Sequence, residues 1–251
     1  LRADSGTQPF VYRNRIGEFS DYMDANVSEF SHIGDILVLP LFEGTEKAPN
    51  NALNGLSRTQ RSLVNEALAS ESFTGKNGKH LSVWTPECRV VLVGMGECPS
   101  DKECRDGGAK TLAALSKDYG TNITVRFTTG WTTSMMALFA EGMILRDYDF
   151  DKYLQKNDDE NQGNWSLDCQ ASRRHQEVLK SEVSKSVAIT KGVHMARELG
   201  NEPANIMYPE EFARRATEWA KDKSNVEIEV WDYARLQKEG MHGVIAVGKG
   251  S

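Results

Sequence analysis

The sequence predicts an α/β protein in which an N-terminal domain is followed by a long helix and by the start of a second α/β domain. Three observations carry this prediction: apolar runs of strand length, segments of helical period between them, and a charged stretch that separates the two parts. Near-continuous apolar strands separated by helices are typical of a sheet that is covered on both faces.

The first part of the chain alternates between strand and helix patterns. Residues 35–42 (DILVLPLF) and 89–94 (RVVLVG) are apolar runs of strand length. Residues 55–70 have a helical period, with an apolar side made by Leu56, Leu63, Val64, Ala67 and Leu68. The same rhythm predicts a helix at about 106–119, a strand at 123–127 and a helix at about 132–145.

A polar stretch then interrupts this rhythm between Asp149 and Gln176. Residues 156–163 (KNDDENQG) are too hydrophilic to pack against a core. The stretch therefore predicts a loop or insertion at a domain edge, with the domain boundary just after it.

A long helix is expected next, over about 175–199. Leu179, Val183 and Val187 recur every four residues, which is the spacing of one helix face. Gly200-Asn201 ends the helix, because both residues tolerate the left-handed conformation of a helix terminus. Such a helix can act as a rigid strut between two α/β units.

The residues after the strut begin a second unit. Pro209 and two acidic residues open a helix that runs from Tyr208 to about Lys221. Residues 226–231 (VEIEVW) and 244–247 (VIAV) read as strands. One or two strands leave a sheet edge uncovered, so Ser251 is not expected to be a natural domain end. The predicted organisation is thus an N-terminal domain over 1–174, a linking helix over 175–200 and an incomplete second domain over 201–251.

Composition excludes several classes of protein. The 251 residues are 39% hydrophobic, and no run approaches the roughly 18 apolar residues of a membrane-spanning helix. The start of the sequence has no targeting pattern, and the four cysteines form no CxxC pair, which predicts reduced thiols and a cytoplasmic location. A formal net charge of -6 without a basic patch disfavours nucleic acid as a partner.

Two glycine-rich segments resemble nucleotide-binding motifs but depart from them. Gly94-Met95-Gly96 follows a strand, yet Pro99 stands at the third glycine position of a dinucleotide fingerprint. In residues 243–251 (GVIAVGKGS), Gly250 separates the lysine from the serine that would hold magnesium in a phosphate-binding loop. A tight strand exit explains the first segment better, and nucleotide binding is not expected at the second.

The five histidines offer one pair with metal-ligand spacing, His194 and Glu198, four residues apart on one helix face. A hydrogen bond or ion pair on the helix surface is the more ordinary interpretation. No HExxH or GxSxG motif is present, so no catalytic, cofactor-binding or metal-binding residue is assigned within residues 1–251.

Residues 189–213 (ITKGVHMARELGNEPANIMYPEEFA) closely resemble the leucine aminopeptidase family, whose members carry an Ala-Arg-x-Leu, Asn-x-Pro-Ala-Asn, Pro-x-x-Phe-Ala succession. Residues 240–251, 90–96 (VVLVGMG) and 140–153 (AEGMILRDYDFDKY) are similar to further family segments in the same order. The resemblance covers about residues 90–251, and residues 1–89 match only in pattern.

The resemblance implies a metal-dependent leucyl aminopeptidase that releases N-terminal amino acids from peptides. It implies a macro-like N-terminal domain, a linking helix, a catalytic domain and a homohexamer. It also implies two divalent metal ions, zinc or manganese, whose ligands lie beyond Ser251 in a Gly-Lys-Gly, Phe-Asp-x-Gly-Gly segment. Lys249 is not the metal-binding lysine, because no Phe-Asp-x-Gly-Gly follows it. Pro203 and Asn205 are expected to fix a turn after the strut helix, with Arg197 pairing across it.

An alternative function is a non-catalytic binding module, in which the macro-like domain holds an ADP-ribose type ligand or a protein partner. In that case the glycines at the strand exit, Gly94 and Gly96, should line a pocket. Fold alone does not carry function, so the pocket itself decides this alternative.

Overall fold

The structure is a computed structural model that describes residues 23–30, 32–70, 73–117, 120–154 and 164–249. Within them the chain divides into two compact units, and the division falls between Glu198 and Leu199. We call residues up to 198 the sheet unit and residues from 199 onward the second unit. In the described part of the chain, no helix is both long and apolar enough to cross a bilayer.

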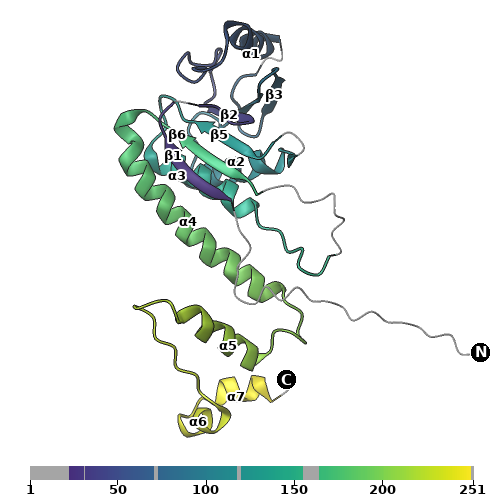
Figure 1. The fold of residues 1–251 in the computed structure, drawn as a ribbon, viewed down its shortest axis with the longest axis vertical. Helices are drawn as coiled ribbons and strands as arrows, with labels where there is room; N and C mark the ends of the chain where they lie inside the picture. Colours follow the sequence, from purple (N-terminus) through teal and green to yellow (C-terminus); the bar gives the residue numbers. More distant parts are fainter. Residues whose placement is uncertain (1–22, 31, 71–72, 118–119, 155–163, 250–251) are drawn as a thin grey trace, which may run out of the picture. The chain divides into compact units, whose positions relative to one another are not determined.

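The sheet unit is built on six strands in the order β1-β6-β5-β2-β4-β3 (Figure 1). Every neighbouring pair is parallel except β3 and β4, which are antiparallel. The strands are β1 (Asp24–Ser28), β2 (Ile36–Leu41), β3 (His80–Trp84), β4 (Arg89–Gly94), β5 (Asn122–Arg126) and β6 (Ser166–Gln170). The predicted α/β class is confirmed, and β1, β3 and β6 are additional to the predicted strands.

Helices cover both faces of this sheet, as predicted. The helices are α1 (Arg58–Ser70), α2 (Asp101–Ala113), α3 (Thr133–Arg146) and α4 (Arg173–Asn201). Successive residues of β2 point to opposite faces. Ile36 and Val38 join a core with α2, α3 and α4, whereas Leu37 and Leu39 join a second core with α1. Burial on both faces explains why β2 and β4 are continuously apolar.

Helices α2 and α3 cross at very short range because glycines lie at the crossing. A Cβ atom at Gly108 would lie 1.9 Å from the carbonyl oxygen of Phe139, and one at Gly142 would lie 1.9 Å from that of Arg105. Any side chain at these positions would push the helices apart. Both helices lie on the same side of the sheet as α4.

Helix α2 begins five residues earlier than the predicted start at 106 and ends at Ala113 instead of 119. Ser100 and Glu103 form a capping box: the Ser100 side chain accepts the Glu103 N–H, and Glu103 Oε2 accepts the Ser100 N–H at 2.8 Å. This pair satisfies two backbone donors that would otherwise be unpaired at the helix start. The local cap therefore overrides the apolar period that placed the start later.

The long helix expected over about 175–199 is present as α4, a single 29-residue helix that ends at Asn201. It buries Leu179 and Val183 against the sheet unit, and Ser186, Thr190 and His194 are buried farther along it.

The second unit contains α5 (Pro209–Ala220), α6 (Tyr233–Lys238) and α7 (His242–Gly248). The two strands predicted here are wrong: residues 226–231 have no regular secondary structure, and residues 244–247 belong to α7. An alternating pattern forms a strand only when a neighbouring strand accepts its hydrogen bonds. The described part of this unit supplies no such neighbour.

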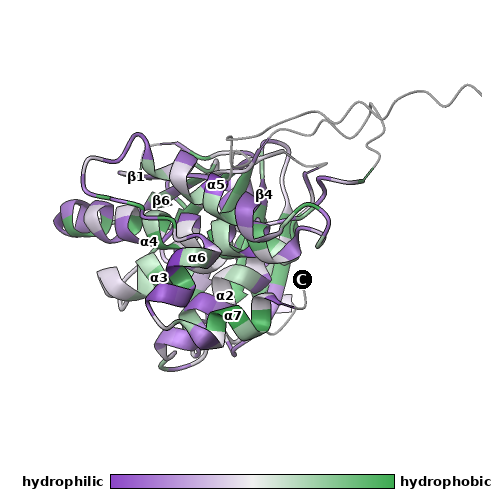
Figure 2. Cartoon of the chain, turned by 90° about the horizontal axis from the view of Figure 1, so that it is seen from below, coloured by the Kyte–Doolittle hydropathy of each residue, from purple (hydrophilic) through white to green (hydrophobic). Residues whose placement is uncertain are grey.

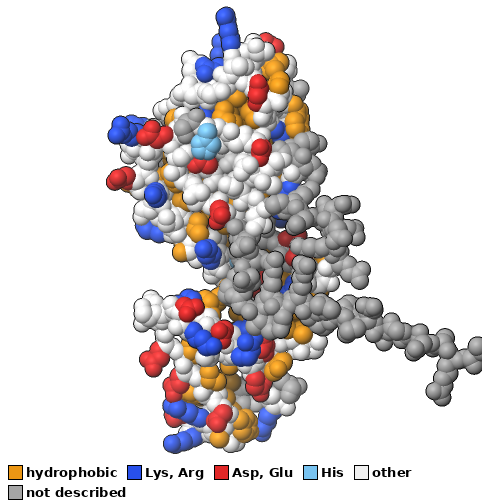
Figure 3. All heavy atoms as spheres, in the orientation of Figure 1, with side chains coloured by type: hydrophobic (Ala, Val, Ile, Leu, Met, Phe, Trp, Pro, Cys, Tyr) orange, Lys and Arg blue, Asp and Glu red, His pale blue; other side chains and the backbone are white. Residues whose placement is uncertain are grey.

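Apolar side chains of the second unit lie at the surface. Figure 2 shows the hydrophobic residues of α7 in green, and Figure 3 shows hydrophobic side chains among the charged ones over α5, α6 and α7. The exposed large residues are Tyr208, Phe212, Ile228, Val230, Tyr233, Met241, Val244 and Val247.

Candidate functional site

His194, one of the two residues at metal-ligand spacing, is fully buried and not on the helix surface as the preferred interpretation expected; its ring lies tilted against the Tyr148 ring, with the ring centroids 5.4 Å apart. Burial lowers the pKa of His194, the nearby Arg197 charge lowers it further, and the carbonyl groups of Leu145 and Ile144 act in the opposite direction. A buried imidazole that contacts the end of α3 is a packing residue. Among the described residues, no group of three or more His, Cys, Asp or Glu side chains is arranged to hold a metal ion.

Arg197 of the family motif contacts α3 rather than the turn that follows α4. Its Nη1 donates to the Leu145 carbonyl at 2.8 Å, and its guanidinium lies 5.5 Å from the centre of the Tyr148 ring. A cation at the carboxyl end of a helix is favoured by the helix dipole. The expectation that Arg197 pairs across the turn is therefore wrong. Instead, it joins two segments that resembled the family separately, those around Tyr148 and Arg197.

A second polar contact ties three helices together in the interior. Arg105 Nε of α2 donates to Glu141 Oε1 of α3 at 2.7 Å, and Ser186 Oγ of α4 donates to Glu141 Oε2 at 3.0 Å. Glu141 is buried, and a buried carboxylate is tolerated only when it is paired and hydrogen-bonded. These bonds use Glu141 as a structural link.

The turn expected after the linking helix is present. The Pro203 carbonyl accepts the N–H groups of Ile206 at 2.8 Å and Met207 at 2.9 Å. Next to it, the buried Glu202 forms a 2.9 Å ion pair with Arg215 of α5. The family signature around residues 201–205 thus anchors α5 to the end of α4.

The glycine-rich strand exit has no free donors for a phosphate group. The N–H groups of Gly94, Met95 and Gly96 donate to the carbonyls of Lys79, Leu41 and Gly75 at 2.7, 2.9 and 2.9 Å. A Cβ atom at Gly94 would lie 2.1 Å from the Lys76 carbonyl oxygen, so glycine is required for backbone packing. The predicted tight strand exit is what the structure contains.

The glycine segment near residue 249 is not a phosphate-binding loop either. Gly243 and Gly248 lie within α7, and Lys249 is its C-cap residue. The strand-loop-helix order that such a loop needs is absent from the described part of this segment.

Aromatic side chains fill the space beside the carboxyl ends of β2 and β5. Trp131 stacks on Phe42 at 5.2 Å and contacts Phe127 at 5.0 Å, and its Nε1 donates to the Pro40 carbonyl at 3.3 Å. The Trp131 side chain is buried. Ligands of open α/β sheets bind beyond the carboxyl ends of the strands, so this packing occupies part of that position.

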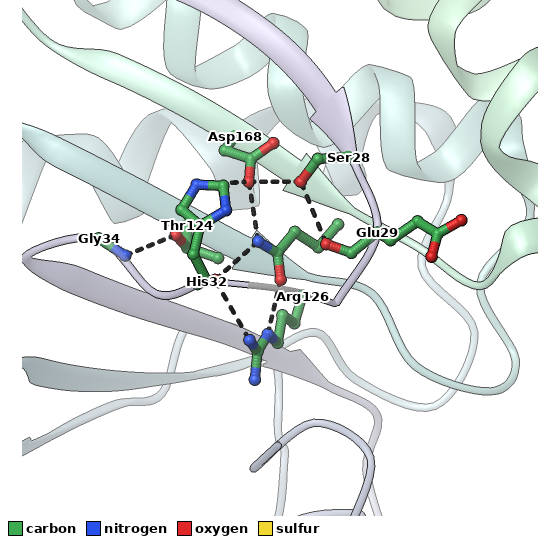
Figure 4. A network of polar contacts seen from close by, with 8 residues as sticks. Ser28, Glu29, His32, Gly34, Thr124, Arg126 and Asp168 are labelled. Atoms are coloured by element: carbon green, nitrogen blue, oxygen red, sulfur yellow. Dashed lines mark hydrogen bonds and ion pairs between the residues drawn. The ribbon is translucent and has the colours of Figure 1, made fainter. Parts of the chain in front are cut away.

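A buried arginine organises the loops on the α1 side of the sheet (Figure 4). Arg126, at the end of β5, is fully buried; its Nε donates to Gln170 Oε1 at 2.8 Å and its Nη2 to the His32 carbonyl at 3.3 Å. Its Nη1 donates to the carbonyls of Ala52 and Asn54. Burial lowers the pKa of Arg126, and Asp168 opposes that effect. Sequence analysis missed this centre, because an arginine at the end of an apolar strand carries no signal of its partners.

Asp168 completes the network around Arg126. Its Oδ2 accepts Ser28 Oγ at 2.7 Å and Gln170 Nε2 at 2.8 Å, and His32 Nε2 lies 3.4 Å away (Figure 4). These contacts join β6 to β1 through Ser28 and to the loop at His32, and the bond between Gln170 and Asp168 lies within β6 itself. The network therefore fixes the loop at His32 against β1 and β6.

These features define the class: a six-stranded α/β domain whose polar clusters hold helices and loops in place, continued by a long helix into a second unit. The chain belongs to the cytosol aminopeptidase family. The model of the family's N-terminal domain matches residues 38–157, and the model of its catalytic domain matches residues 194–251.

Curated relatives agree with this assignment. A probable cytosol aminopeptidase of Methylobacterium radiotolerans is 33% identical over 230 residues, which cover 87% of this chain and 44% of that protein. One from a Bradyrhizobium species is 33% identical over 215 residues, covering 81% and 41%. The chain thus spans less than half the length of these relatives.

Solved structures share the fold. A mutant of tomato leucine aminopeptidase matches with a TM-score of 0.72 at 23% identity, covering 88% of this chain and 47% of that one. The bottromycin maturation enzyme BotP in complex with Mn matches with a TM-score of 0.63 at 20% identity, covering 87% and 43%. At these identities the likeness concerns the fold alone.

Proposed function

We propose that this chain is the N-terminal portion of a metal-dependent leucyl aminopeptidase that releases N-terminal amino acids from peptides. The observation that carries the proposal is the match of two family models in the order of the family, the second of them, for the catalytic domain, over residues 194–251. In this proposal residues 1–251 serve support and assembly.

The proposed organisation is an N-terminal domain over 1–174, the linking helix over 175–200 and the first part of the catalytic domain over 201–251. The second unit supports this division. None of the residues of α5 or α6 is buried, so the apolar side chains of this unit have too few partners to form a core within the described residues. In the proposal, further residues of a catalytic domain cover them.

The cofactors in this proposal are two divalent metal ions, zinc or manganese, held by residues outside 1–251. Such ions act as Lewis acids and activate water for attack on a carbonyl group. Peptides are the substrates, the assembly is a homohexamer and the location is the cytoplasm. One structural neighbour carries Mn, which is consistent with this choice of metals.

The test is an assay of two proteins, the 251-residue chain and the longer product of the same reading frame. We expect the longer protein to release leucine from leucine p-nitroanilide with Mn²⁺ or Zn²⁺. This activity should be lost when a chelator removes the metal. The 251-residue chain should be inactive with either metal. A longer protein that binds no metal and cleaves no peptide would refute the proposal.

The alternative function, binding of ADP-ribose at the glycine-rich strand exit, has little support. The backbone donors of Gly94 and Gly96 are used internally, and the first turn of α2 carries Asp101 and Glu103, which repel a phosphate. Isothermal titration of the chain with ADP-ribose is expected to give a flat trace.

A further inference from the structure

A cavity of about 310 Å³ lies on the sheet unit between α2, α3 and the end of α4. Its lining includes Arg105, Ala109, Gly142, Arg146, Tyr148 and Arg197. Three of these residues are arginines, and each comes from a different helix. Arg105 and Arg197 each make a structural contact, to Glu141 and to the Leu145 carbonyl. Neither contact fills the cavity.

Small residues line part of this cavity. Gly142 and Ala109 lie in its wall, where α2 and α3 approach so closely that a Cβ atom at Gly142 would meet the Arg105 carbonyl at 1.9 Å. The longer side chains of Arg105 and Arg146 line the cavity on either side of these small residues. The helix crossing thus produces a hollow whose rim carries guanidinium groups.

The charges around the hollow do not cancel. Glu141 pairs with Arg105 at 2.7 Å, and Asp106, the acidic residue of the lining, pairs with Lys102 at 2.7 Å. Arg146 and Arg197 form no ion pair with a carboxylate in the part of the chain that the structure describes. When both pairs are counted as neutral and Asp147, whose pKa burial raises and the Arg146 charge lowers, is set against Arg146, the hollow keeps an excess of about one positive charge.

Two of the three guanidinium groups are held in place before any ligand arrives. Arg105 uses its Nε on Glu141, and Arg197 uses its Nη1 on the Leu145 carbonyl while lying over Tyr148. Their other guanidinium N–H groups make no hydrogen bond to the described residues. Donors that are already positioned lose less entropy on binding. The negative end of α3 opposes an anion here, and the hydrogen bond from Arg197 to the Leu145 carbonyl offsets part of this effect.

We propose that this hollow is a binding site for a small phosphorylated molecule, recognised through its dianionic phosphate group. Guanidinium groups match the oxygens of a phosphate with parallel N–H donors, and several arginines around one anion are the usual arrangement for phosphate. The volume is at the lower end of the range for small-molecule sites and holds a phosphate with a short organic group. This inference is independent of the proposed peptidase activity.

The test is a titration of the ¹⁵N-labelled chain with inorganic phosphate and with glycerol phosphate at constant ionic strength, followed by NMR. We expect saturable shifts of amides around residues 105–109, 142–148 and 197. The Arg146→Gln variant should weaken binding about tenfold or more, because it removes one charged donor. Arg146 makes no hydrogen bond or ion pair to the described residues, so this change should leave the fold intact. Arg105→Gln would be a poorer choice, because it leaves Glu141 buried without its partner.

Arg174→Gln is the matched control, because Arg174 is an exposed arginine of α4 that does not line the hollow. It should leave both affinities unchanged. Tighter binding of glycerol phosphate than of inorganic phosphate identifies an organic phosphate as the ligand, and equal binding identifies the phosphate group alone. Shifts that do not saturate, or equal weakening by Arg146→Gln and Arg174→Gln, would overturn the site.

Discussion

The two units have similar local helix signals but very different burial. Helix α3 of the sheet unit buries eight residues, among them Phe139 and Met143, whereas α5 of the second unit buries none. Yet α5 begins with Pro209 at its first turn and two acidic residues, both of which favour a helix start. Helical stability in proteins comes mainly from packing of an apolar face, so good local signals alone do not make a stable unit.

The largest expected difference between the units is in hydrogen exchange. Amides of β2, β4 and β5 lie in the centre of a covered sheet and should exchange only through global unfolding. Amides of α5, α6 and α7 should exchange through local opening, at least about 100-fold faster. Exchange followed by mass spectrometry measures both in one experiment. Equal protection in the two units would show that the second unit has a core of its own.

Paired phenylalanine substitutions should sharpen the comparison. Phe139 is fully buried, with edge-to-face contacts to Phe127 and Trp131 at 5.9 Å, whereas Phe212 is 52% exposed. Phe139→Ala should lower the free energy of unfolding by about 3–5 kcal/mol. Phe212→Ala should change it by less than about 0.5 kcal/mol. Urea unfolding followed by fluorescence tests both, and a large loss in the Phe212 variant would contradict the comparison.

Two helical glycines provide a backbone version of the same test. Gly142 has no room for a Cβ atom, since the Arg105 carbonyl would lie 1.9 Å away, and Gly243 of α7 has nothing within 4 Å. Gly142→Ala should destabilise the sheet unit by about 1–3 kcal/mol through overpacking. Gly243→Ala should be neutral or raise helix stability by up to about 1 kcal/mol. Thermal unfolding and far-UV circular dichroism report the two effects, and a neutral Gly142→Ala would show that α2 and α3 separate easily.

Sequence patterns predicted the strands that are apolar on both faces, and also β5, although Thr124 and Arg126 make one of its faces polar. The strands β2 and β4 are apolar on both faces and were predicted, whereas β1 (DANVS) and β6 (SLDCQ) carry polar residues on one face and were missed. The polar face of β6 holds Asp168, which accepts a hydrogen bond from Ser28, and Gln170, which accepts one from Arg126. A strand that exchanges apolar packing for a polar network loses the pattern by which strands are found.

The candidate sites show the same limit. The capping box of Ser100 and Glu103 was readable in the sequence and would have corrected the start of α2. The partners of Arg126 lie 44 to 94 residues away along the chain, and the residues next to Arg126 in the sequence do not indicate them. The strand pattern at 226–231 was misleading, because alternation alone does not supply a neighbouring strand.

Two carboxylates should give the units opposite pH dependence, with small effects. Burial raises the pKa of Asp147 in the sheet unit, although the Met23 N–H donates to it at 2.9 Å. The folded state then binds its proton more tightly than the unfolded state does. The free energy of unfolding therefore falls as pH rises from about 4 through the folded pKa. Asp147→Asn keeps an acceptor for the Met23 N–H and should gain stability over the parent chain across that rise, by less than about 1 kcal/mol.

Glu211 in the second unit should behave in the opposite way. Hydrogen bonds from Arg214 and Arg215 lower the pKa of Glu211 to about 2. The contribution of Glu211 to stability is therefore complete above its unfolded-state pKa of about 4.3 and is lost as pH falls through its folded-state pKa of about 2. Glu211→Gln should reduce the protection of α5 amides at pH 6 by only about 2–5-fold, because solvent screens these pairs, and should have a much smaller effect near pH 2, where Glu211 is about half protonated. Hydrogen exchange of α5, corrected for the intrinsic rate at each pH, measures this, and a Glu211 variant whose effect is the same at both pH values would show that the ion pairs do not hold α5.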